Sequence, residues 1–97
     1  MYYVVSRWEP LPGKSEEFEN KARKLRGIMK SQSGVSFLEG FRTEDGGEVA
    51  IVGYNSRADY DRIVNNPNGP FASAVAAEDL DSIARWVWSE RGEANSD

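Results

Sequence analysis

The sequence of 97 residues contains neither histidine nor cysteine. Without these residue types the chain cannot build a Ser-His-Asp triad, a thiolate nucleophile, or a zinc or heme site with histidine or cysteine ligands. Disulfides are excluded as well, so nothing indicates an oxidising compartment. Any acid or base must be Asp, Glu, Lys or Tyr, with its pKa shifted by the surroundings if it works near neutral pH. We expect no metal site and no cofactor.

Long apolar runs and a surplus of basic residues are also missing. No stretch approaches the roughly 20 apolar residues that span a bilayer, and residues 1–5 lack the basic and apolar regions of a signal peptide. The 12 basic residues are outnumbered by 16 acidic ones, and the net charge of −4 argues against a nucleic-acid partner. The expectation is a cytoplasmic protein without a membrane or nucleic-acid partner.

The first third of the chain has the pattern of a strand followed by a helix. Residues 2–9 are rich in aromatic and β-branched side chains, which favour a strand. Ser15 is expected to cap a helix that extends to Lys30, with acidic residues in the first turn and basic residues later. Its buried side is predicted from apolar spacings of three and four to consist of Phe18, Ala22, Leu25 and either Ile28 or Met29.

Two strands and a second helix are predicted next. Residues 35–43 and 48–54 are typical of strands, and the Asp-Gly step between them is a hairpin signal. Ser56 and Asp59 have the spacing of a capping box. This spacing predicts a helix from residue 57 to about residue 65.

The last third is predicted to form a short helix and a strand. The helix is expected over residues 71–77 and the strand over residues 82–90. Strict alternation along this strand places Trp86 and Trp88 on one face and Arg85 on the other. The two tryptophans are expected to line a pocket or to fill a dimer interface.

This order of elements predicts an α+β, ferredoxin-like split βαβ fold with a four-stranded antiparallel sheet and its helices on one face. A single domain is expected over residues 1–91, with a disordered tail over residues 92–97. The strand at residues 49–54 is apolar on both faces, although the helices can cover only one. A second copy of the chain is the simplest cover for the other face, so we expect a homodimer that packs sheet to sheet.

Several segments resemble the antibiotic biosynthesis monooxygenase (ABM) family of dimeric α/β barrels, over about residues 3–91. They are Pro12-Gly13-Lys14 before the Glu-rich helix start, Ser33-Gly34-Val35, the run of residues 51–59, and Pro70-Phe71. The resemblance implies a ferredoxin-like monomer, a homodimeric barrel and a pocket between sheet and helices. Similar barrels serve as quinol monooxygenases, heme-degrading enzymes, isomerases and small stress proteins, so the fold alone does not define an activity.

The family's functional residues carry over poorly. Heme-degrading members have an Asn on the first strand, a Trp on the second helix and an axial His on the following helix. The matching positions here are Ser6, Ile63 and Val75, which argues against heme degradation by that route. Members that oxidise polycyclic phenols use an Asn and a Trp on the second helix, where this chain has Asp59 and Ile63.

If the first-strand match holds, Val4, Ser6 and Trp8 face the pocket. The remaining lining residues are predicted to be Tyr60, Ile63, Phe71 and Val75. Such an aromatic and aliphatic lining with a few polar groups is typical of a small-molecule site, and plain core packing is the alternative.

Glu39 is the candidate general base. It alternates in register with Val35, Phe37 and Phe41, and a carboxylate among apolar side chains has a raised pKa unless it is paired. The alternatives are exposure or a salt bridge to an arginine, for which the candidates are Arg7, Arg42 and Arg85. Arg85 is also a candidate for holding an anionic substrate oxygen.

The leading hypothesis is a small homodimeric ABM-like protein that acts as a cofactor-independent monooxygenase on a phenolic or quinol-type aromatic. A deprotonated, electron-rich substrate can reduce dioxygen itself, so the protein needs only a dry aromatic pocket, a base and a donor for the developing oxyanion. The alternative is a non-catalytic dimer with the same fold that binds a small ligand or serves a stress response.

Overall fold

The computed structural model describes residues 1–96 of the chain. Its strands are β1 (Tyr2–Pro10), β2 (Val35–Arg42), β3 (Glu48–Tyr54) and β4 (Ala84–Glu93). Its helices are α1 (Ser15–Lys30), α2 (Arg57–Tyr60) with the π-helical turn η1 (Asp61–Asn65), and α3 (Pro70–Glu78) with the 3₁₀ turn η2 (Leu80–Ser82). Within this part of the chain, no helix combines the length and apolar character needed to cross a membrane.

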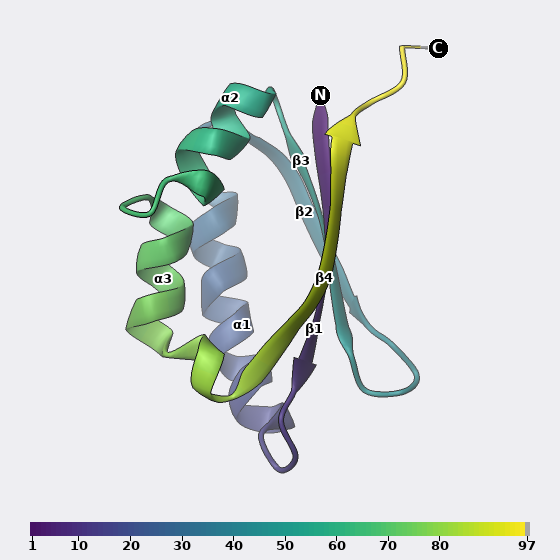
Figure 1. Ribbon diagram of the computed structural model, residues 1–97, viewed down its shortest axis with the longest axis vertical. Coiled ribbons are helices and arrows are strands. Elements are labelled where there is room, and N and C mark those ends of the chain that lie inside the picture. Colours follow the sequence, from purple (N-terminus) through teal and green to yellow (C-terminus); the bar gives the residue numbers. More distant parts are fainter. Residues whose placement is uncertain (97) are drawn as a thin grey trace.

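The strands form one antiparallel sheet in the order β2-β3-β1-β4. All the helices pack against the same face of this sheet, and the other face is left open (Figure 1). This arrangement confirms the predicted α+β, ferredoxin-like fold. We call the face that carries the helices the inner face and the opposite one the outer face.

Helix α1 buries the side that its sequence pattern predicts. Phe18, Ala22 and Met29 are buried, whereas Ile28 is exposed, so Met29 is the residue that completes the apolar stripe. The predicted cap is wrong. The helix is capped at Lys14 without a side-chain hydrogen bond, which places Ser15 inside the first turn.

The capping box at the start of α2 is confirmed. The Ser56 hydroxyl accepts a hydrogen bond from the Asp59 backbone N–H (3.2 Å) and donates one to the Asp59 carboxylate (2.9 Å). The bonds from Ser56 and from the Arg62 guanidinium lower the pKa of Asp59. Gly34 has a positive φ of 98°, and a Cβ there would lie 2.6 Å from the Asp59 side chain, so this corner requires glycine.

The core consists of two clusters of buried side chains along the inner face. The first contains Tyr2, Val4, Met29, Leu38, Val52, Tyr54, Tyr60 and Ile63. The second contains Trp8, Phe18, Ala22, Leu80, Ile83 and Ala84. Leu25 and Phe71 pack against both clusters, so they mark the place where the two meet.

Strand β4 continues beyond the predicted domain boundary at residue 91. Gly92 pairs with Tyr3, Glu93 pairs with Tyr2, and the Ala94 backbone N–H donates to the Met1 carbonyl (2.8 Å). The first residues of the predicted tail at 92–97 therefore belong to the sheet, because the first strand offers them backbone partners. Asp97 lies outside the described residues.

Candidate functional site

Strand β1 directs alternate side chains toward the helices. Val4 and Trp8 are buried on the inner face, and Ser6 lies between them in the same row. Their β3 partners Val52, Ala50 and Glu48 lie on the same face, because directly paired residues in an antiparallel sheet project to the same side.

A cavity of about 80 Å³ lies over this row, between the sheet and the helices. Its walls are mostly aromatic and aliphatic: Val4, Ser6, Trp8, Leu25, Arg26, Met29, Leu38, Ala50, Val52, Tyr54, Tyr60, Val64, Phe71 and Trp86. The lining includes Val4 and Tyr54 of the first core cluster, Trp8 of the second, and Leu25 and Phe71, which pack against both, so the cavity lies where the clusters meet. The volume is small for a ligand site.

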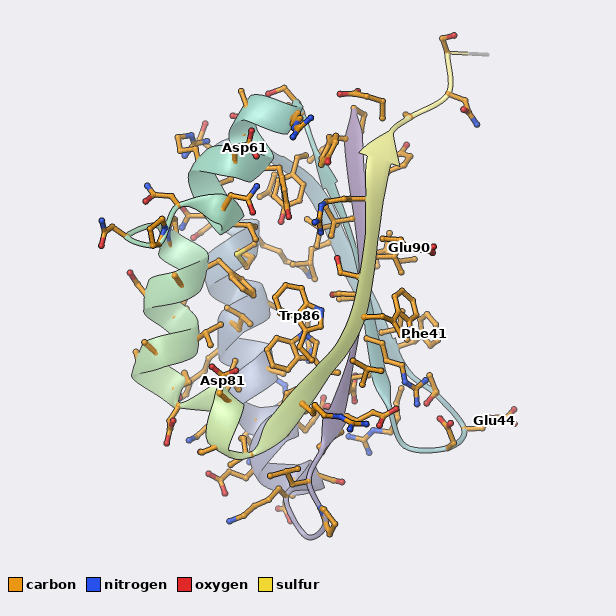
Figure 2. The ribbon with its side chains drawn as sticks, in the orientation of Figure 1. Phe41, Glu44, Asp61, Asp81, Trp86 and Glu90 are labelled. Carbon is orange, nitrogen blue, oxygen red and sulfur yellow. The ribbon has the colours of Figure 1, made fainter. Side chains whose placement is uncertain are left out.

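Trp86 forms the wall of the cavity on the side of β4 (Figure 2). Its indole stacks on Trp8 with ring centroids 5.6 Å apart and meets Phe71 edge to face at 6.1 Å. The side chain is 43% exposed, because β4 is an edge strand. Trp86 therefore contacts the buried Trp8, the partly buried Phe71 and solvent.

The prediction that Trp86 and Trp88 share a face is wrong. Trp86 pairs with Trp8, whereas Trp88 pairs with Arg7 on the outer face. A bulge at Val87 inserts an extra residue between them, which reverses the alternation. The Trp86 indole N–H donates to the Trp88 carbonyl (3.0 Å) across this bulge.

Five of the residues predicted to face the pocket line the cavity: Val4, Ser6, Trp8, Tyr60 and Phe71. Ile63 does not, because it is completely buried in the first core cluster. The next residue, Val64, lines the cavity instead. The π-helical turn at Asp61–Asn65 contains both residues, and its wider winding shifts the side-chain directions expected for an α-helix. Val75 instead lines a separate open groove, together with Phe71 and Trp86.

Glu39 and Arg85 lie on the outer face, away from the cavity. A bulge at Ser36 shifts the register of β2. Phe37, Glu39 and Phe41 therefore pair with outer-face residues of β3, whereas Val35 pairs with Tyr54 on the inner face. Glu39 is exposed, and its position does not fit a base that acts on a ligand in this cavity. Arg85 is also exposed and pairs with Glu9 (3.2 Å), so it does not fit an oxyanion holder there.

Comparisons with solved structures bear on this arrangement. SnoaB, a cofactor-independent oxygenase from Streptomyces nogalater, superimposes with a TM-score of 0.78 at 18% identity, over 99% of this chain and 94% of that chain. An antibiotic biosynthesis monooxygenase superimposes with a TM-score of 0.79 at 16% identity, over 98% of this chain and 99% of that chain. Rv0793 from Mycobacterium tuberculosis superimposes with a TM-score of 0.80 at 15% identity, over 99% of this chain and 96% of that chain. No protein-family model and no curated protein matches the sequence.

The chain has the fold of the antibiotic biosynthesis monooxygenases. At such identities the likeness concerns the fold, and the chemistry depends on the side chains present. In this ABM fold the cavity lining contains four polar or charged side chains besides the indoles: Ser6, Arg26, Tyr54 and Tyr60. Burial raises the pKa of Tyr54, so its hydroxyl stays protonated at neutral pH and is able to donate a hydrogen bond.

The cavity residues that the sequence does not predict come mainly from α1, β2 and β3. Arg26 and Met29 of α1 and Leu38 of β2 line the cavity, although the basic run that contains Arg26 resembles an ordinary solvated helix face. The apolar stripe of α1 is the sequence feature that indicates the position of Arg26 at the cavity, because Arg26 follows Leu25 directly and lies one turn before Met29.

A network of charged side chains lies beside the cavity, between α1 and the β2–β3 end of the sheet. Glu19 accepts from Arg26 (3.4 Å) and from Arg42 (3.1 Å), and Arg42 also donates to Glu48 (3.1 Å). The pKa of Glu48 is raised, mainly because the carboxylate is partly buried and also because it lies beside Glu19. The hydrogen bond from Arg42 lowers this pKa but does not cancel the rise. Across residues 1–96, no group of three or more acidic side chains is placed to hold a metal ion.

Proposed function

We propose that this protein is a cofactor-independent monooxygenase that oxidises a small phenolic or quinol-type aromatic in the cavity of the inner face. The aromatic wall formed by Trp8, Trp86 and Phe71 carries this proposal, because stacked and edge-to-face rings favour a flat aromatic ligand. The shared fold with SnoaB, a cofactor-independent oxygenase, supports the same reaction class.

The proposed chemistry uses the electrons of the substrate. Oxidation of a phenol to a quinone by dioxygen removes four electrons from the phenol, leaves one oxygen atom on the ring and releases the other as water. The phenolate is the reactive form, since it is more electron-rich than the phenol. The apolar walls exclude water, and the hydroxyls of Ser6 and Tyr54 are donors for oxygen atoms that gain negative charge.

We further propose that a second copy of the chain covers the outer face. This face exposes large apolar side chains from several strands: Tyr3, Phe37, Phe41 and Trp88. Figure 2 shows Phe41 on the side of the sheet opposite the helices. Exposed large apolar side chains on several strands of one sheet face are typical of a self-association interface.

A ligand-binding protein without catalytic activity is the second candidate. Among the described residues, no Asp or Glu lines the cavity, so the cavity lacks a carboxylate base. The small volume of about 80 Å³ also requires side chains to move before a ring of several fused cycles can enter.

Oxygen uptake in the presence of a panel of quinols and dihydroxynaphthalenes separates the two candidates. The monooxygenase is expected to consume oxygen and to transfer one ¹⁸O atom from ¹⁸O₂ to the product. Glu39→Gln is expected to leave the pH profile unchanged, because Glu39 lies on the outer face. Ligand binding without oxygen uptake would favour the binding protein, and absence of binding by any member of the panel would contradict both.

A further inference from the structure

Arg26 is the one charged residue among those that line the cavity. It projects from the C-terminal half of α1, and its side chain is 29% exposed. Within the described part of the chain, its guanidinium donates one hydrogen bond, to Glu19 at 3.4 Å. A guanidinium has five N–H donors, so Arg26 retains donors for a further acceptor.

The charges around Arg26 leave a local excess of positive charge. Arg23, Arg26 and Arg42 share the carboxylate of Glu19, at 3.8, 3.4 and 3.1 Å, and Arg42 also pairs with Glu48. Three guanidinium groups therefore face two carboxylates, in a chain whose net charge is −4. Glu19 makes its shortest contact with Arg42, so it neutralises Arg26 only in part.

Arg26 also connects the cavity to solvent. It lines an open groove of about 460 Å³ together with Glu19, Gly40, Phe41, Arg42 and Glu48. A ligand whose ring lies against Trp8 and Trp86 can therefore direct a polar substituent toward Arg26 and the groove without burying it completely.

We propose that Arg26 binds an anionic oxygen of the ligand, so that the cavity prefers aromatic acids and phenolates to neutral aromatics of the same size. This inference rests on the proposed function, because it assumes that an aromatic ring occupies the cavity. A guanidinium beside the oxygen favours the ionised form of a phenol, which is also the form that reacts with dioxygen.

Arg23 provides a matched control. It lies on the same helix and pairs with the same oxygen of Glu19, but its side chain is 69% exposed and it does not line the cavity. A purely structural role of the arginines in holding Glu19 would make the Arg23→Gln and Arg26→Gln variants behave alike. A ligand-binding role affects Arg26 alone.

The test is isothermal titration with benzoate and with benzyl alcohol, which have similar size and differ in charge. The wild type is expected to bind benzoate about tenfold more tightly, as a charge-assisted hydrogen bond provides. Arg26→Gln is expected to remove this preference while its affinity for benzyl alcohol changes less than twofold. Arg23→Gln is expected to keep the preference, and Arg26→Lys to keep part of it.

Equal affinity of the wild type for the two probes, or the same loss in both glutamine variants, would overturn the role of Arg26. If neither probe binds the wild type, the proposed aromatic site itself is contradicted. Circular dichroism of each variant verifies that it is folded, and Arg26→Lys keeps the test valid if Arg26→Gln does not fold.

Discussion

The two faces of the sheet are built from the same strands, yet they differ in what covers them. On the inner face, Val4 and Trp8 are buried beneath helices and surround a cavity. On the outer face, Tyr3 and Phe41 are equally apolar but are 41% and 53% exposed. Apolar strands therefore do not by themselves make a core. The helices enclose a cavity on one face and leave the apolar side chains of the other face exposed.

The largest effect is expected from Ile63→Ala on the inner side. Ile63 is completely buried, so the substitution removes apolar contacts and leaves a cavity, at a cost of about 2–5 kcal/mol in the free energy of unfolding. Val64→Ala, the adjacent change at the cavity wall, is expected to cost less. Urea denaturation measures both, and equal losses would contradict the assignment of Ile63 to the core and Val64 to the cavity.

The next effect concerns assembly through the outer face. Phe41→Lys places a charge on the outer face at β2, within the proposed interface, where burial of the charge would be costly. Light scattering after size exclusion is expected to give the mass of a dimer for the wild type and of a monomer for the variant. Ser73→Lys, on the exposed side of α3, is the control and should remain dimeric. A wild-type protein that is monomeric at micromolar concentration would contradict the interface.

A smaller effect is expected at the cavity wall. Trp86→Ala removes the ring that stacks on Trp8, which is worth about 1 kcal/mol, or roughly fivefold in affinity for an aromatic ligand. Trp88→Ala removes a tryptophan from the outer face of the same strand and should leave the affinity unchanged. Titration with benzoate measures both variants, and equal losses would show that the two faces are not independent.

The smallest effect concerns the pH dependence of the helix layer. Hydrogen bonds from Ser56 and Arg62 lower the pKa of Asp59 in the folded protein. The carboxylate therefore contributes stability above its ordinary pKa, and this contribution is lost as the pH falls toward the lowered value. The difference in melting temperature between the wild type and Asp59→Asn should be largest near pH 7 and should shrink below pH about 4. A constant difference would contradict the shift.

The sequence predicts the order of the elements because their periodicity and turn signals are local. It does not predict the bulges at Ser36 and Val87, which depend on how neighbouring strands pair. Each bulge reverses the faces of the residues beyond it. For this reason Trp88 does not share a face with Trp86, and Glu39 does not share a face with Val35. The π-helical turn has the same consequence for Ile63 and Val64.

Alternation in the sequence predicts the faces of residues on regular segments correctly. Ser6 and Trp8 belong to the part of β1 that pairs without interruption with β3, and alternation alone assigns their face correctly. The sequence does not predict Arg26 as a cavity residue, because its neighbours in sequence are charged, whereas its position at the cavity depends on the packing of Leu25 and Met29 beside it. Sequence patterns therefore do not predict cavity residues such as Arg26, whose position depends on tertiary packing.

The chain contains 3 tryptophans, and they report directly on the contrast between the faces. Trp8 and Trp86 line the cavity, whereas Trp88 lies on the outer face. In ¹⁹F NMR of protein labelled with 5-fluorotryptophan, addition of benzoate should shift the Trp8 and Trp86 resonances and leave Trp88 in place. The Phe41→Lys variant should shift Trp88 alone. A benzoate-induced shift confined to Trp88 would contradict the assignment of the binding site to the inner face.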